Sequence, residues 1–125
     1  MVNHTGGCMI GRHSDENYIQ VLEGISIKTL VHGESTLMTE FRLSRGSQLP
    51  AHSHPYEQTG YLISGSLTLH AGGKSFTVKP GDSWCIGRDE SHGAEVHEDS
   101  VALEVFSPAR GDYIKYLAAS DLEQG

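Results

Sequence analysis

The sequence predicts an all-β protein, an antiparallel sandwich or barrel with one short helix at its C-terminal end. From Tyr18 onward, short runs rich in Val, Ile, Leu, Thr and Phe recur, and Gly, Pro, Asp and Ser separate them. Short apolar runs at this spacing are typical of sandwiches and barrels. The chain has 125 residues and no internal repeat. A chain of this length predicts a single domain.

The elements follow one another in a simple order. Residues 1–17 are polar and lack periodicity, so we expect a loosely ordered leader before a domain that spans residues 18–125. AGGK after His70 and KPGD after Val78 predict turns between strands. The segment GDYIKYLAAS predicts the helix, with Asp112 as its cap. The predicted strands cover residues 18–22, 25–32, 36–44, 58–64, 66–70, 75–78, 83–86, 93–97 and 101–106.

Composition and charge exclude several classes of function. The net charge of −7 argues against a nucleic-acid-binding surface and against a basic face that binds membranes. No segment approaches the roughly 20 apolar residues that span a bilayer. The first residues lack the basic and apolar blocks of a secretion signal. The two cysteines, Cys8 and Cys85, are too few and too far apart for a disulfide framework, which favours a cytoplasmic protein with reduced thiols. We expect Cys85 to be a small core residue.

The segment AHSHPYEQTGYLISG, residues 51–65, carries the first functional signal. Side chains at positions i and i+2 of a strand share a face, so His52 and His54 should point the same way. The same alternation adds Gln58 to their face and places Glu57 on the opposite one. The alternative is that both histidines lie on a surface loop before a strand.

The context of these residues resembles the cupin family. Gly46 precedes His52 by six positions, Gly65 follows Gln58 by seven, and a KPGD turn and then His92 come later. The resemblance implies a cupin-type jelly-roll β-barrel with one divalent metal ion inside. Carried over position by position, it implies that His52, His54, Gln58 and His92 are the metal ligands. The family usually has glutamate where this chain has Gln58.

The glutamine has an electrostatic consequence. Three histidines and a glutamine bring no negative charge to a divalent cation, so the metal would keep its full positive charge. Such a metal is a stronger Lewis acid and attracts an anionic substrate. Imidazole and amide ligands suit Mn, Fe, Co, Ni or Zn.

The last predicted strand contains a single charged residue, Glu104. Glu104 and Phe106 share one face of this strand, and the aliphatic residues between and before them share the other. The pattern alone favours a Glu104 that points to water. However, HSHPYEQTGYLISG, KPGD, SHGAE and ALEVFSPARGDY together are similar to small cupins of the pectin-degradation type. This closer resemblance implies that Glu104, Phe106 and Arg110 are catalytic residues, although the subfamily usually has aspartate at position 104. The alternative for Arg110 is a surface residue beside Asp112.

The closer resemblance also implies an enzyme that opens a 4,5-unsaturated uronate, a small anionic substrate, to its keto form. It further implies a homodimer, and we expect neither a nucleic acid nor a membrane as partner. One alternative is a metal-dependent dioxygenase, because three histidines with open coordination positions also suit iron and oxygen. Another is a non-enzymatic cupin that binds a sugar acid or a metal. The neutral Gln58 argues against the oxygenase, and an acid paired with Arg110 favours the first function.

Overall fold

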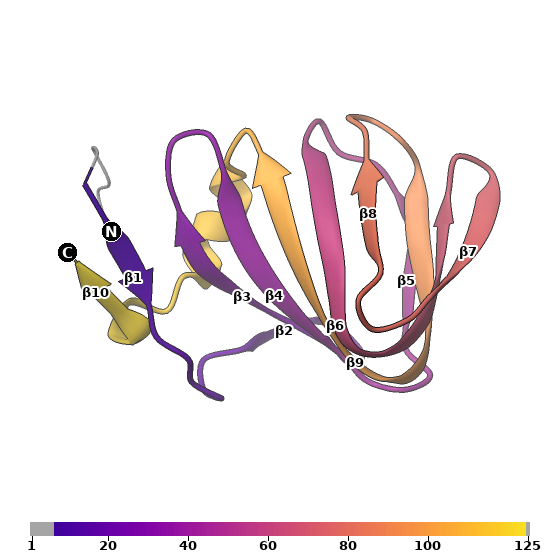
Figure 1. The fold of residues 1–125 in the computed structure, drawn as a ribbon, viewed down its shortest axis with the longest axis horizontal. Helices are drawn as coiled ribbons and strands as arrows, with labels where there is room; N and C mark the ends of the chain where they lie inside the picture. The colour runs from indigo at the N-terminus through magenta and orange to yellow at the C-terminus, as the bar shows by residue number, and fades with distance from the viewer. Residues whose placement is uncertain (1–6, 125) are drawn as a thin grey trace.

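The structure is a computed structural model that describes residues 7–124, and it is a jelly roll built from antiparallel strands (Figure 1). The all-β prediction is confirmed, although the two layers form an open sandwich rather than a closed barrel. The strands are β1 (Met9–Gly11), β2 (Ile19–Leu22), β3 (Ile25–His32), β4 (Leu37–Leu43), β5 (Gln48–His52), β6 (Glu57–Ala71), β7 (Lys74–Val78), β8 (Ser83–Ile86), β9 (His92–Ser107) and β10 (Leu122–Gln124).

The long strands β6 and β9 connect the two layers. Their partners change along their length: the first half of β6 pairs with β8, and its second half pairs with β7. Likewise, β9 pairs with β5 near its start and with β4 near its end. Both strands bend sharply at the lower end of the view in Figure 1. Neither strand crosses between the layers at the upper end of the view, which is therefore the open end of the sandwich.

Alternation within the strands builds the core between the layers. In β6, Gln58, Gly60 and Leu62 are buried, while Glu57, Thr59 and Tyr61 are exposed, as the sequence predicts. Burial of aliphatic side chains from both layers is the main stabilising contribution to such a sandwich. The core cluster consists of Ile25, Leu43, Leu62, Leu67, Leu69, Val78, Ile86, Val96 and Ala102.

Gly65 forms the corner at which β6 passes from one layer to the other. Its φ is +98°, and the register of β6 against β9 shifts on both sides of it. A Cβ atom at this position would overlap the Ser100 hydroxyl and lie 2.6 Å from the Asp99 carbonyl oxygen. The corner therefore requires glycine for both its backbone conformation and its packing.

We expect Gly65→Ala to destabilise the fold more than Gly46→Ala, its matched control. Gly46 has a similar φ of +83°, but no atom lies within 4 Å of its virtual Cβ. Backbone strain at positive φ should cost about 1–3 kcal/mol in both variants. Overpacking should add about 1–3 kcal/mol only at Gly65. Equilibrium urea unfolding measures the difference, and equal losses in the two variants would contradict the steric argument.

Two terminal segments differ from their predictions. The predicted leader includes β1, which pairs with β10 beside β3, and the Lys28 ammonium group binds Ser14, Glu16 and Asp121. The first six residues of this leader lie outside the described residues, and the domain boundary at residue 18 stays a prediction.

The predicted C-terminal helix consists of two short 3₁₀ helices, η1 (Gly111–Tyr116) and η2 (Ala119–Asp121). Asp112 does not cap a helix, because its carboxylate binds the Arg110 guanidinium instead. Leu117 is extended and bridges to Thr29 at the edge of β3, which interrupts the helical path. The long-range contact between Leu117 and Thr29 overrides the local periodicity here.

The prediction that Cys85 is a core residue is wrong. Cys85 is exposed on the outer face of β8 rather than buried in the core, because its neighbours Trp84 and Ile86 face inward. Cys8 is also exposed, and both thiols are free.

Within residues 7–124, none of the helices is long and apolar enough to cross a membrane.

Candidate metal centre

Three histidines from separate parts of the chain converge at one end of the sandwich. His52 is the last residue of β5, His54 lies in the following loop, and His92 is the first residue of β9. Strand pairing places His52 directly opposite His92, and their ring centroids are 4.3 Å apart. The His54 ring centroid lies 4.9 Å from that of His92. One nitrogen from each ring lies within 4.8 Å of the other two, so the group is able to hold a metal ion.

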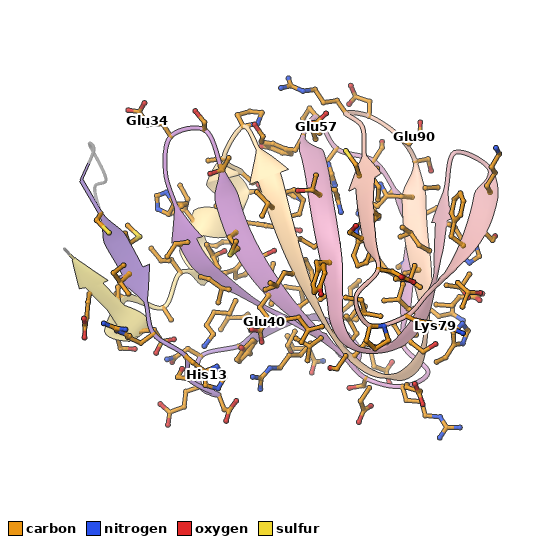
Figure 2. The ribbon with its side chains drawn as sticks, viewed as in Figure 1. His13, Glu34, Glu40, Glu57, Lys79 and Glu90 are labelled. Atoms are coloured by element: carbon orange, nitrogen blue, oxygen red, sulfur yellow. The ribbon has the colours of Figure 1, made fainter. Side chains whose placement is uncertain are left out.

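The site lies at the open end of the sandwich. Figure 2 shows Glu57 and Glu90 at this end, at the top of the view, and Lys79 toward the opposite end. Glu57 directly precedes Gln58, and Glu90 lies two positions before His92. Strand alternation predicted that His52 and His54 share one strand face, but β5 ends at His52. The two rings nevertheless come together, with centroids 5.7 Å apart.

Backbone carbonyl groups orient two of the imidazole rings. The carbonyl oxygen of Pro50 lies 2.9 Å from Nδ1 of His52, and that of Glu90 lies 2.9 Å from Nδ1 of His92. A carbonyl group only accepts, so each Nδ1 carries a hydrogen and each Nε2 keeps a free lone pair. This is the tautomer in which Nε2 is able to ligate a metal.

Burial favours the neutral form of the inner histidines. Burial is the main cause that lowers the pKa of His54 and of His92. The positive charge of Arg110 lowers both pKa values further, whereas Gln58 opposes this effect at His54. A metal ion binds neutral imidazole, so this environment suits a metal site.

Gln58 supplies a fourth candidate ligand. Its side chain is buried, and its Nε2 atom donates a hydrogen bond to Oε2 of Glu104 at 2.7 Å. The Gln58 Oε1 atom is buried without a hydrogen-bond partner, as is Nδ1 of His54. An unpartnered buried amide oxygen is costly unless something binds it. Three imidazoles and this oxygen therefore fit a divalent transition metal.

Glu104 faces the interior rather than water. It lies on β9 opposite Gly60 of β6, and its carboxylate accepts hydrogen bonds from Gln58 and from the indole Nε1 of Trp84, the latter at 3.0 Å. Burial raises the pKa of Glu104 to about 8, and the hydrogen bonds from Trp84 and Gln58 act in the opposite direction. The structure thus overturns the solvent-facing alternative that the strand pattern favours.

Phe106 and Arg110 lie beside the histidines. The Phe106 ring is fully buried and meets the His54 ring edge-on at 5.7 Å. The Arg110 guanidinium carbon lies 3.6 Å from the centroid of the Tyr113 ring and 4.9 Å from that of the Phe106 ring. Its Nε and Nη2 atoms donate to the Asp112 carboxylate at 3.1 and 2.8 Å. Arg110 is therefore buried among aromatic rings, although it does lie beside Asp112.

One cavity of about 80 Å³ is lined by all the predicted site residues, His52, His54, Gln58, His92, Glu104, Phe106 and Arg110. The volume is small for a complete ligand pocket, so it has room for an ion and only part of a ligand. Among the lining residues with polar side-chain atoms, Trp84 and Tyr113 are the two that the sequence patterns did not single out. The inward alternation of Trp84 with Ile86 on β8 was a signal for the first. Tyr113 lies in the segment with the mistaken helix prediction, where no pattern marks it.

A jelly roll with three histidines and a glutamine at its open end defines a class of small β proteins with a candidate metal centre. The chain belongs to the cupin family, because the Cupin domain matches residues 39–107.

The chain is also similar to individual proteins. It is 28% identical over 94 residues to the pectin degradation protein KdgF of Dickeya dadantii (strain 3937), which covers 74% of this chain and 86% of KdgF. The structure of KdgF from Halomonas sp. superposes with a TM-score of 0.78 and 27% identity, over 82% of this chain and 97% of that one. Nitrosourea synthase of Streptomyces achromogenes subsp. streptozoticus is 32% identical over 74 residues, but these cover 58% of this chain and only 15% of the synthase.

Proposed function

We propose that this protein is a metal-dependent cupin that converts a 4,5-unsaturated uronate to its open-chain keto form. The similarity to KdgF over most of both chains supports a cupin that acts in pectin degradation on unsaturated uronates. The observation that carries the proposal is the buried Glu104 carboxyl group, which contacts the candidate ligand Gln58 and lines one cavity together with the histidines and Arg110. The reaction needs a group that transfers protons, a cation that binds the substrate carboxylate and a polarising charge. Glu104, Arg110 and the metal would supply these three in turn.

The reaction is an isomerisation that needs proton transfer at two places. The anomeric hydroxyl loses a proton as the ring C–O bond opens, and the ring alkene gains one as the resulting enol becomes a ketone. Glu104 is the buried group that would carry such a proton. A carboxyl group whose pKa lies near neutral pH both accepts and releases protons readily.

The other residues would bind and orient the substrate. His52, His54, Gln58 and His92 would hold the metal, which when bound supplies positive charge to attract and polarise a carboxylate or hydroxyl group. Asp112 occupies the Nε and Nη2 edge of Arg110, so a substrate carboxylate would meet the Nη1 side. Phe106 would exclude water from the reacting groups.

The proposal predicts consumption of an unsaturated uronate that depends on a divalent metal. We expect the purified protein, loaded separately with Mn, Fe, Co, Ni or Zn, to bleach the ultraviolet absorbance of 4,5-unsaturated galacturonate and to form a keto product. The chelator-treated protein is the control. If no metal supports consumption of the uronate, the proposed activity is wrong. Substrate binding without consumption would favour the non-enzymatic cupin, and stoichiometric oxygen uptake would favour the dioxygenase. The homodimer and the cytoplasmic location stay predictions.

A further inference from the structure

The Glu104 carboxylate connects a tryptophan to the candidate metal ligand Gln58. Its Oε1 atom accepts from Nε1 of Trp84 at 3.0 Å, and its Oε2 atom accepts from Nε2 of Gln58 at 2.7 Å. We propose that Trp84, acting through Glu104, orients the Gln58 amide so that its oxygen rather than its nitrogen faces the three histidines. This inference rests on the proposed metal site but not on the proposed reaction. Trp84 is a positioning residue in this arrangement, because it would act on Gln58 through Glu104.

The orientation matters because the oxygen and the NH₂ group of an amide are nearly equal in size. A rotation of the Gln58 amide by 180° would fit the same space but would turn its NH₂ group toward the histidines. A neutral NH₂ group donates hydrogen bonds and offers no lone pair to a cation. Both Glu104 oxygens accept hydrogen bonds, Oε1 from Trp84 and Oε2 from Gln58, so the Oε2 atom favours the orientation in which Nε2 of Gln58 faces Glu104. The Gln58 Oε1 atom, which is buried without a partner, is then left for the metal.

Trp84 reaches Glu104 only because the residue between them is glycine. Gly60 of β6 pairs with Trp84 on β8 and with Glu104 on β9, so the three residues form one row across the sheet. A Cβ atom at Gly60 would overlap the indole ring of Trp84. The indole lies over the β6 backbone at Gly60 and donates to a residue two strands away. The donor that holds Glu104 is therefore part of the sheet architecture.

This arrangement gives a structural reason for glutamine at position 58. A glutamate at this position would bring a second carboxylate to the place where Gln58 now donates to Glu104 at 2.7 Å. Two carboxylates in contact in a dry site repel each other strongly. Exchanging the two residues, by Gln58→Glu with Glu104→Gln, restores one amide and one carboxylate in contact. The exchanged pair should again present an oxygen to the metal.

The test measures binding of Co²⁺ alone, without substrate, by calorimetric titration and by the visible absorption of the bound ion. We expect Trp84→Phe, which keeps an aromatic ring but removes the N–H donor, to raise the Kd for Co²⁺ by about 10–100-fold. Its Co²⁺ spectrum should change as the amide ligand is lost in part of the molecules. Gln58→Glu and Glu104→Gln should each weaken binding similarly, and the exchanged double variant should recover to within about threefold of wild type.

Two controls separate orientation from general damage. Tyr61→Phe removes a polar group from the exposed face of β6 next to Gly60 and should leave the Co²⁺ affinity and spectrum unchanged. Thermal unfolding of the metal-free Trp84→Phe variant reports whether it is folded. Unchanged Co²⁺ affinity in Trp84→Phe, or additive losses in the exchanged variant, would overturn the inference. Absence of Co²⁺ binding by the wild type would overturn it together with the metal site, whereas failure to consume a uronate would overturn only the reaction.

Discussion

Replacing Glu104 by glutamine should lower kcat on an unsaturated uronate by on the order of 10²–10⁴ with little change in KM. Glutamine keeps the size of the side chain but cannot transfer a proton. Glu104 is the acid that the fold buries in the cavity with Arg110 and the candidate ligands. The rate should be measured at a metal concentration that saturates the variant, with bound metal quantified, because Glu104 also contacts Gln58.

Arg110→Ala is the contrasting variant for this experiment. Arg110 would hold the substrate carboxylate, so its removal should mainly raise KM, and it should lower kcat only to the extent that the arginine also aligns the ring. The Arg110 contacts are with aromatic rings and Asp112, so bound metal should stay near the wild-type level. Wild-type turnover in Glu104→Gln at full metal occupancy would show that Glu104 does not move the proton.

The double variant His52→Ala with His92→Ala should lose its metal almost completely. The wild type should retain about one divalent ion per chain, whereas loss of two of three imidazoles leaves too few ligands for tight binding. Elemental analysis after dialysis measures the metal content. Activity on the uronate should fall with it.

His70→Ala with His97→Ala is the matched control, since it also removes two imidazoles. His70 binds Ser75 and His97 binds Thr68, both at 2.7 Å, and neither ring lies in the three-histidine group. This control should keep its metal. Full metal occupancy in the His52 and His92 double variant would show that the ligand set is wrong.

The apolar alternation of the sequence was enough to predict most of the strands and one face of β6. Period-two patterns reflect the geometry of the strand itself, so the burial of Gln58, Gly60 and Leu62 could be predicted without knowing their neighbours. The resemblance to cupins added His92, which lies far along the chain from His54. The structure brings the three histidines together within 4.8 Å.

The C-terminal segment shows where local patterns fail. Its apolar spacing predicted a helix with Asp112 as the cap, but the Asp112 carboxylate binds Arg110 and the backbone at Leu117 bridges to Thr29. The bridge to Thr29 joins distant parts of the chain, and no local period predicts it. The segment therefore forms two short 3₁₀ helices in place of the predicted helix.

By itself, then, the sequence determined most of the residues that form strands and which of them share a face, whereas β1, β5 and β10 lie outside the predicted strands. Tertiary structure alone decided which face of β9 is the inner one, because apolar side chains occupy both: Ala102 and Phe106 on one, Leu103 and Val105 on the other. Pairing with β4 and β6 turned Glu104 inward, and the row through Gly60 brought Trp84 to it. Alternation along one strand is a local property, whereas the side that becomes the interior depends on how distant strands pair.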